Sequence, residues 1–515
     1  MTIFTGPHPG ADIPDVPLTS YVLGQAEQHA DTVAAVDVTG GFSYTYGELA
    51  AGARHAAAGL AALGFGRGDV LAMLAPNLPE YPIAYHAALL AGGAVVVLNP
   101  LDTVDELASH LTEAAARFIV TTPSEMDKVT ELAGRTRLDQ VIVFGAAAGA
   151  TSFYGLLDTG YAPPGPPVTP SRDVATVLHS SGSTGHPKGV ALTHRNMVAN
   201  VYQTSVVAPL GVGEKVLAVP PFHHAFGLIM TLNASLLQGA TLVTMPRFEP
   251  DAYLKAIEDH RITRLYIVPT IAVLLARSPL VDHYDLSSLR SIVSGGAALD
   301  PEIALLCHDR LGFHIGQGYG LTEGLVSFMQ LPGSVPNGSV GRNSPNVECK
   351  IVDPETGAAL DRHQDGEILV RGPHVMKGYL GDADATRKVL EPDGFLHTGD
   401  LGHVDEHGDL FIVDRIKELI KYKGQQVSPV ELEAVLMAHP KVTDAAVVGV
   451  PDEEATELPK AFVVVDQPAT AEEIMAFVAE RVAPYKKIRR VEFIDKIPRT
   501  PVGKTERRTL KERAA

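Results

Sequence analysis

The sequence predicts an α/β protein with a large N-terminal part, a β-rich region after it and a smaller α+β C-terminal part. Between about residues 30 and 121, short β-branched runs alternate with Ala- and Leu-rich segments of helical length, which indicates parallel sheets covered by helices. From about residue 347, short strand-like runs are separated by glycine-containing turns. The chain has 515 residues. This length is too great for one hydrophobic core, so about two to four domains or subdomains are expected.

The alternating segment near the N-terminus divides into predicted strands and helices. Thr45 with Glu48, and Thr103 with Glu106, match the capping box that begins a helix. No G-x-G-x-x-G follows the first strand, which excludes an NAD-binding fold. The predicted strands are 33–38, 69–75, 94–98 and 117–121, and the predicted helices begin at Thr45 or span 80–91 and 103–115.

The overall composition is that of a soluble globular protein, with 45% hydrophobic and 20% charged residues. The 42 basic and 60 acidic residues give a net charge of −18, which argues against nucleic acid as a partner. The longest apolar stretch, 81–98, is broken by Pro82, His86 and two glycines, so it predicts a helix and a buried strand, not a membrane span. Two cysteines cannot form a disulfide framework. We expect a cytoplasmic enzyme that is a monomer or a homodimer.

A stretch poor in side chains lies between two apolar runs, 174–178 and 190–192, and reads Ser180-Ser181-Gly182-Ser183-Thr184-Gly185-His186-Pro187-Lys188-Gly189-Val190. Its backbone N–H groups and hydroxyls can approach an anion, and Lys188 adds a positive charge, as is typical of a phosphate-binding loop. A flexible linker seldom carries a Pro-Lys-Gly end. The spacing is not G-x-x-x-x-G-K-[ST], so this is no Walker A loop.

Four further segments indicate chemistry. Tandem histidines in 221–228, after a predicted strand at 215–220, suit a pocket wall. Glycine-rich turns are predicted at 295–299, after a strand at 291–294, and at 316–323, after a strand-like run at 313–315. Thr398-Gly399-Asp400 offers a carboxylate that could accept two hydrogen bonds from a vicinal diol. The segment 498–504 has the form Pro-x-x-x-x-Gly-Lys and is followed by arginines.

In this order and spacing, these motifs resemble the adenylate-forming superfamily of acyl- and aryl-CoA ligases, peptide-synthetase adenylation domains and beetle luciferases. The resemblance covers about residues 20 to 510 and is strongest to the 4-coumarate–CoA ligase and medium-chain acyl-CoA ligase branch. It implies an N-terminal ATP- and acid-binding domain at 1–413, with α/β/α sheets and a small β-barrel-like region. It also implies a hinge at 414–418 with Lys417 as pivot, and a mobile α+β domain at 419–515 that carries the catalytic lysine.

The resemblance further implies a role for each matching residue. The implied ATP- and AMP-binding residues are Ser180, Ser181, Gly182, Ser183, Thr184, Gly185, Lys188, Gly296, Ala297, Gln317, Gly318, Tyr319, Gly320, Leu321, Thr322, Asp400, Arg415 and Lys504. The implied acid pocket consists of His224, Phe226, Met230, Gly295, Gly318 and Gly320. The implied Mg²⁺ ligands are Thr184 and Glu323. The implied catalytic residues are Lys504, His224, Thr322, Glu323, Lys421 and Gln426.

The function that follows is ATP- and Mg²⁺-dependent activation of an aromatic or medium-chain apolar carboxylic acid to acyl-AMP, with release of pyrophosphate. Transfer to CoA would then give a thioester and AMP. An alternative is transfer to an amine, an amino acid or a carrier protein, because Gln425 stands near the second substrate where most relatives have an aromatic residue. A non-catalytic acyl or nucleotide sensor is a further alternative, which the intact Lys188, Glu323, Asp400 and Lys504 disfavour.

Overall fold

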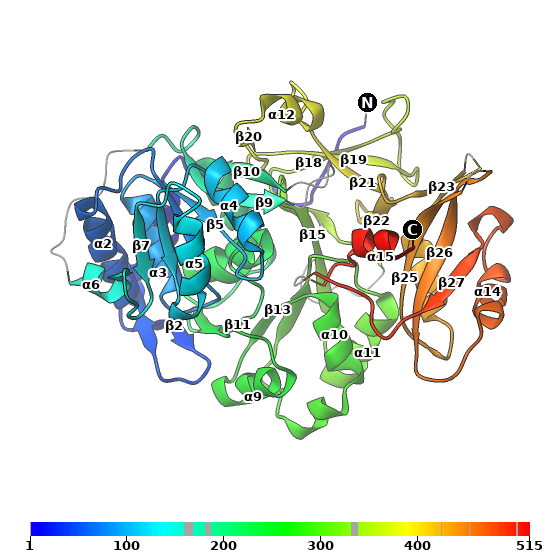
Figure 1. The fold of residues 1–515 in the computed structure, drawn as a ribbon, viewed down its shortest axis with the longest axis horizontal. Helices are drawn as coiled ribbons and strands as arrows, with labels where there is room; N and C mark the ends of the chain where they lie inside the picture. Colours follow the sequence, from blue (N-terminus) through cyan, green and yellow to red (C-terminus); the bar gives the residue numbers. More distant parts are fainter. Residues whose placement is uncertain are drawn as a thin grey trace.

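The computed structural model describes residues 2–158, 168–180, 187–330, 338–423, 425–452, 454–500 and 503–514. The strands in these ranges form two large sheets, an antiparallel sheet and a C-terminal sheet (Figure 1). Residues 159–167, which include the Pro-rich run 162–167, lie outside the described residues. Within the described ranges, no helix combines the length and apolarity that a membrane span requires.

The first large sheet is parallel from β9 to β8 and carries the antiparallel β10 and β20 at its other edge. Its described strands lie in the order β20 (Gly378–Tyr379), β10 (Lys188–Thr193), β9 (Val174–Ser180), β5 (Ala94–Val97), β4 (Val70–Leu74), β6 (Phe118–Thr121), β7 (Gln140–Val143) and β8 (Thr151–Ser152).

The second large sheet is parallel from β15 to β2 and antiparallel at both ends. Its described strands lie in the order β17 (Arg342–Asn343), β16 (Leu325–Met329), β15 (Ile315–Leu321), β14 (Ser291–Ser294), β13 (Arg264–Ile267), β11 (Lys215–Ala218), β12 (Thr241–Thr244), β2 (Val33–Asp37) and β3 (Ser43–Thr45).

The β-rich region is an antiparallel sheet with its described strands in the order β1 (Phe4–Thr5), β18 (Glu348–Val352), β19 (Gly366–Arg371), β21 (Leu396–Val404) and β22 (Leu410–Arg415). The C-terminal sheet orders its described strands as β24 (Gln425–Val427), β23 (Ile420–Tyr422), β26 (Thr456–Val465) and β25 (Val442–Asp452), with β27 (Arg490–Phe493) parallel to β26.

Helices cover the faces of the sheets (Figure 1). The described α-helices are α1 (Leu18–Leu23), α2 (Tyr46–Ala62), α3 (Tyr81–Leu90), α4 (Val104–Glu113), α5 (Met126–Ala133), α6 (Phe153–Leu157), α7 (His194–Val207), α8 (Ser235–Leu237), α9 (Pro250–His260), α10 (Pro269–Arg277), α11 (Pro301–Leu311), α12 (Ala383–Val389), α13 (Pro429–Met437), α14 (Ala471–Ala479) and α15 (Arg507–Ala514). A π-helix, η3 (Gly227–Ala234), precedes α8, and short 3₁₀ turns are η1 (Ala26–His29), η2 (Pro123–Glu125), η4 (Pro279–His283) and η5 (Pro484–Lys486).

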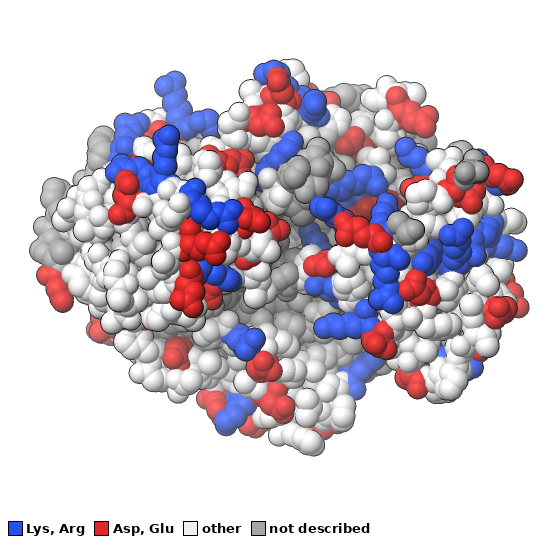
Figure 2. Space-filling view, in the orientation of Figure 1, with Lys and Arg blue, Asp and Glu red and all other residues white. Residues whose placement is uncertain are grey.

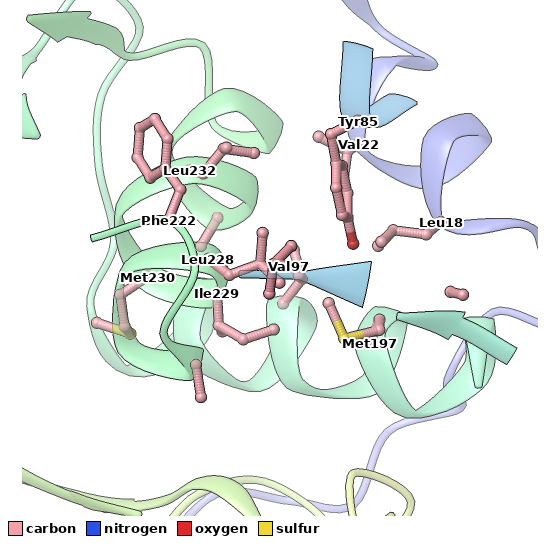
Figure 3. Packing of buried hydrophobic residues seen from close by; sticks show 14 of the residues in the cluster. Leu18, Val22, Tyr85, Val97, Met197, Phe222, Leu228, Ile229, Met230 and Leu232 are labelled. Carbon is pink, nitrogen blue, oxygen red and sulfur yellow. The ribbon is translucent and has the colours of Figure 1, made fainter. Parts of the chain in front are cut away.

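Alternating side chains of the parallel strands fill separate core layers. In β4, Leu71 and Met73 belong to the main core between the two large sheets, whereas Ala72 and Leu74 belong to the outer layer under α4 and α5. Figure 3 shows the main core around α1, α3, α7 and η3. A third cluster joins the outer face of the second sheet to α9, α10 and α11. The predicted stacking of helices on both faces of parallel sheets is therefore confirmed.

The predicted N-terminal elements are confirmed as β2, α2, β4, α3, β5, α4 and β6. Thr45 and Thr103 form the predicted capping boxes with Glu48 and Glu106. One prediction is wrong: residues 316–321 are not a turn but most of strand β15. Gly320 allows close strand pairing there, because a Cβ on this residue would lie 1.9 Å from the Leu325 carbonyl oxygen of β16.

Candidate active site

The predicted phosphate loop joins two antiparallel strands, β9 and β10. Ser180, the last residue of β9, lies directly opposite Lys188, the first residue of β10. The Nζ atom of Lys188 lies 3.9 Å from Oδ2 of Asp382 and 4.9 Å from the ring centroid of Tyr379. The predicted loop residues Ser181 to Gly185, including the predicted metal ligand Thr184, lie outside the described residues.

Residues far apart in the sequence line one cavity. The predicted residues that line it are His224, Phe226, Gly295, Gly296, Gly318, Tyr319, Gly320, Leu321, Thr322 and Lys504. The remaining lining residues, which the sequence does not single out, are Ala225, Leu325, Val326 and Met329. The cavity therefore joins the segment before η3, the turn after β14, strands β15 and β16, and the C-terminal lysine.

His224 is neutral and has a defined hydrogen-bond direction. Burial, and then the neighbouring Lys504 and His223, lower the pKa of His224 to about 3. The backbone N–H of Phe226 donates to Nδ1 of His224 at 3.3 Å, so the ring proton is assigned to Nε2. His224 can therefore donate a hydrogen bond from Nε2 to an anionic group in the cavity.

Lys504 is held in place by a short closed loop. Its N–H donates to the Thr500 hydroxyl at 3.1 Å, and its carbonyl oxygen accepts from the Thr500 N–H at 2.8 Å. The preceding Gly503 adopts φ +79°, and a Cβ there would lie 3.7 Å from Cβ of Val268 on the large domain. Burial, and then Arg415, lower the pKa of Lys504 to about 8. The loop thus delivers a lysine to the cavity at the surface of the large domain.

Asp400 lies beside the cavity and is held by two neighbours. The Tyr319 hydroxyl donates to Oδ2 of Asp400 at 2.5 Å, and Nε of Arg415 lies 2.9 Å from Oδ1. Burial alone would lower the pKa of Arg415. The negative charges of Asp400 and Glu418 outweigh the effect of burial, so the pKa of Arg415 is raised. Since Tyr319 also lines the cavity, the carboxylate and the acid-pocket residues belong to one connected site.

Glu323 follows β15 and faces the lysine of the phosphate loop across Tyr379. The Tyr379 hydroxyl donates to Oε1 of Glu323 at 3.0 Å, and burial followed by Glu323 raises the pKa of Tyr379. Among the described residues, no cluster of three or more metal-ligating side chains occurs. One carboxylate fits an Mg²⁺ ion that takes its remaining ligands from phosphates and water.

Three of the predicted site residues, Met230, Gln317 and Ala297, are not among the residues that line the cavity. Met230 is fully buried in the main core and is not among the residues that line this cavity, so its place in the acid pocket remains a prediction (Figure 3). Met329 of β16 is the methionine among the lining residues. Gln317 accepts from the Leu299 N–H at 3.1 Å and so fixes the turn after β14. Ala297 is half-buried beside Gly296.

Two residues predicted to be catalytic, Lys421 and Gln426, pair with each other in the C-terminal sheet. Lys421 is exposed on β23 and is not among the residues that line the cavity. Lys417 is an exposed residue in the turn that follows β22, where the Glu418 N–H donates to the Arg415 carbonyl oxygen at 2.9 Å.

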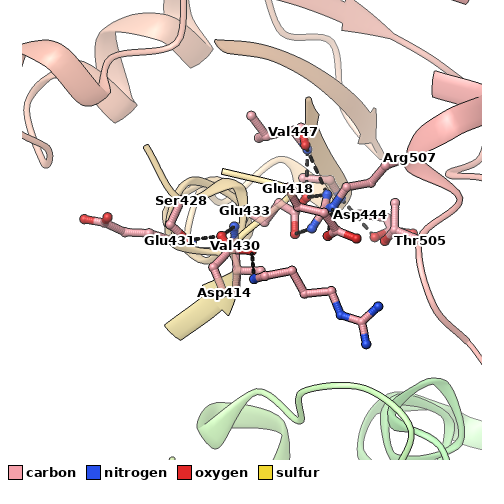
Figure 4. A network of polar contacts seen from close by, with 12 residues as sticks. Asp414, Glu418, Ser428, Val430, Glu431, Glu433, Asp444, Val447, Thr505 and Arg507 are labelled. Atoms are coloured by element: carbon pink, nitrogen blue, oxygen red, sulfur yellow. Dashed lines mark hydrogen bonds and ion pairs between the residues drawn. The ribbon is translucent and has the colours of Figure 1, made fainter. Parts of the chain in front are cut away.

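A buried polar network fixes the C-terminal lysine loop to this turn (Figure 4). Arg507 pairs with Glu418 at 2.8 Å and with Glu433, and also donates to the Val447 carbonyl oxygen at 3.0 Å. Burial alone would lower the pKa of Arg507. The carboxylates of Glu433 and Glu418 outweigh the effect of burial and raise the pKa of Arg507. The Ser428 hydroxyl, which caps α13, also donates to Asp414 at the end of β22.

Positive side chains gather near the cavity, where they would attract an anionic ligand. Despite the net charge of −18, Lys and Arg side chains gather around the junction between the large part of the molecule and the C-terminal part (Figure 2). A local excess of positive charge attracts a polyanion even when the whole molecule is acidic.

A lysine and a histidine that line one cavity, with a buried carboxylate beside it, are the arrangement that the motifs predict for an adenylate-forming enzyme. Residues 23–380 match the family model described as AMP-binding enzyme, and residues 431–504 match the AMP-binding enzyme C-terminal domain. The chain belongs to the AMP-binding enzyme family, which confirms the resemblance found in its motifs.

Three known proteins illustrate this membership. The 4-coumarate–CoA ligase 5 of Oryza sativa subsp. japonica is 39% identical, over all of this chain and 97% of its own length. The structure of a benzoate CoA ligase from Burkholderia xenovorans LB400 is 30% identical with a TM-score of 0.87, over 96% of this chain and 99% of that one. The structure of the amide bond synthetase McbA from Marinactinospora thermotolerans is 31% identical with a TM-score of 0.87, over 97% of this chain and 100% of that one.

Proposed function

We propose that this enzyme activates an apolar carboxylic acid with ATP, releases pyrophosphate and transfers the acyl group from acyl-AMP to CoA. The observation that carries the proposal is the meeting of His224 and Lys504 in one cavity that continues through Tyr319 to Asp400. Names of relatives such as 4-coumarate–CoA ligase and benzoate CoA ligase support the reaction class.

Each proposed role follows from charge and position. Asp400 accepts the two ribose hydroxyls and Arg415 supports it, while Lys188 binds the outer phosphates. The acid's carboxylate receives the Nε2–H of His224 and the ammonium of Lys504. A bound Mg²⁺ on Glu323 would offset phosphate charge.

The chemical step joins two anions. A carboxylate oxygen bonds to the α-phosphorus as the bond to the pyrophosphate oxygen breaks, and pyrophosphate carries away the electron pair. Lys504 places positive charge between the acyl and α-phosphate oxygens, where negative charge builds up. In the second step a thiol displaces AMP from the acyl carbon.

The lining of the cavity supports an acid with an apolar body. Among the described lining residues, Lys504 is the only charged side chain, and the floor and walls combine glycines with Leu325, Val326 and Met329. A second carboxylate or an ammonium group on the acid would be desolvated there without a partner. We therefore propose an aromatic or medium-chain apolar acid.

The acyl acceptor has one alternative with specific support. The likeness to an amide bond synthetase, together with Gln425 at the position where an aromatic residue is usual, favours an amine as second substrate. In that case the first step and its residues are unchanged.

One reaction mixture separates these possibilities. Enzyme, ATP, Mg²⁺, CoA, a panel of aryl and aliphatic acids and a set of amines are incubated together, and products are identified by mass spectrometry. An acyl-CoA product supports the proposal and names the acid class. An amide without thioester supports the alternative, and the absence of any AMP-linked product with every acid contradicts both.

A further inference from the structure

A carboxylate behind the phosphate loop bridges the two strands that carry it. Glu113, the last residue of α4, accepts from the Gly189 N–H at 3.0 Å through Oε1, and its Oε2 lies 3.4 Å from Nε2 of His179. His179 and Gly189 are direct partners in the pairing of β9 with β10. The next pair toward the loop is Ser180 with Lys188. Glu113 therefore contacts the pair of residues that is adjacent to the proposed phosphate-binding lysine in the strand ladder.

The surroundings of Glu113 are closely fitted. A Cβ on Gly189 would lie 3.1 Å from Oε1 of Glu113, so the absence of a side chain there allows the carboxylate to approach the backbone. The side chain of His179 is 9% exposed and stacks on His110, with ring centroids 3.7 Å apart and planes 14° apart. His110 in turn lies 4.0 Å from Asp102. Stacking on His110 therefore limits the movement of the His179 ring beside Glu113.

The carboxylate of Glu113 is ionised at neutral pH. Burial opposes its charge, but His179 and the Gly189 N–H outweigh burial, and the pKa of Glu113 is lowered. A hydrogen bond from a backbone N–H to a carboxylate is about twice as strong as one between neutral groups. Glu113 thus holds the backbone at Gly189 with a strong bond from a separate helix.

We propose that Glu113 is a positioning residue for ATP, which sets the direction of Lys188 toward the β- and γ-phosphates by fixing the stem of the loop. The inference rests on the proposed function, since it takes the loop to hold ATP. Glu113 itself lies behind the sheet ladder and contacts neither the cavity nor the ribose-binding residues. Its effect is therefore specific to the outer phosphates.

The test compares ATP with AMP, because AMP lacks the phosphates that Lys188 binds. Binding of each nucleotide with Mg²⁺ is measured by isothermal titration calorimetry for the wild-type enzyme, Glu113→Ala and Glu113→Gln. We expect Glu113→Ala to raise the Kd for ATP about tenfold and to leave that for AMP unchanged. Glu113→Gln keeps an acceptor for Gly189 but loses the charge beside His179, so an intermediate effect is expected.

Two controls make the result decisive. Glu131→Ala removes an exposed carboxylate of α5 whose ion pair, within the described residues, is with Arg135 just beyond the end of the helix, and it should change neither Kd. Equal weakening of ATP and AMP in Glu113→Ala, or no change in either, overturns the inference. Because the assay needs no acid and no CoA, wild-type enzyme that binds no nucleotide would instead contradict the proposed function.

Discussion

In the proposed reaction, Lys504 brings a desolvated ammonium group to the place where two anions meet. A preorganised charge at such a place is worth about a hundred- to a thousandfold in rate. We therefore expect Lys504→Ala to lower acid-dependent ATP–pyrophosphate exchange by that factor. ATP binding should change much less, because Lys188 and Asp400 remain. Exchange at the wild-type rate in Lys504→Ala would exclude the assigned role.

The pKa of Lys504 also predicts how the reaction depends on pH. A pKa of about 8 means that the side chain is charged below pH 8 and loses its charge as the pH rises through that value. The kcat/KM for ATP, which reports the free enzyme, should therefore fall about tenfold per pH unit above pH 8. In Lys504→Arg the guanidinium stays charged, so the alkaline fall should disappear even if the rate is lower. An alkaline fall shared by both enzymes would assign it to another group.

At this scale, the sequence predicts the residues whose types carry chemistry. His224 and Lys504 line the cavity, and Asp400 lies beside it with Arg415, while the roles that their motifs indicate remain predictions. The apolar walls are not predicted, since Val326 and Met329 resemble core residues until the antiparallel pairing of β15 with β16 is known. Tyr379 is missed for the same reason, because its partner Glu323 is set by the fold.

Strand β15 forms the floor of the cavity and shows how the sequence alone can mislead at the scale of an element. Its repeated glycines predict a turn, but the segment is a strand, and one of the glycines, Gly320, allows close contact with the neighbouring backbone. A Cβ on Gly320 would collide with Leu325, whereas a Cβ on Gly316 would have its nearest neighbour, the Gln330 carbonyl oxygen, at 3.6 Å.

These two glycines form a matched pair for mutation. Gly320→Ala should separate β15 from β16, lower the melting temperature and reduce ATP–pyrophosphate exchange more than tenfold, because overpacking costs about 1–3 kcal/mol or more and moves the cavity floor. Gly316→Ala in the same strand should be near wild type in both measurements. Similar behaviour of the two variants would show that contact with Leu325 does not constrain the strand.

At the scale of the whole molecule, Lys504 of the C-terminal part joins a cavity whose other described lining residues come from the large domain. The order of the motifs predicts this division, and the contact of Gly503 with Val268 could not be predicted, because it depends on how two separately folded parts meet. Lys421 is not among the residues that line the cavity in this arrangement. The family resemblance implies that a rotation of the C-terminal part about the turn at Lys417 brings Lys421 and Gln426 to the acyl-AMP, and this hinge remains a prediction.

A reversible cross-link tests that rotation. Cysteines at Gly503 and Val268 would have Cβ atoms about 3.7 Å apart, within the range of natural disulfides, and the native Cys307 and Cys349 are buried. Cysteine at the positive φ of Gly503 costs about 1–2 kcal/mol, so the reduced double variant provides the reference rate. Oxidised Gly503→Cys/Val268→Cys should form acyl-AMP at that rate but yield no thioester or amide, and dithiothreitol should restore the second step. The single variant Val268→Cys, treated alike, should be unaffected. If the oxidised enzyme completes both steps, the second step proceeds without rotation, since the lysine loop cannot leave the large domain.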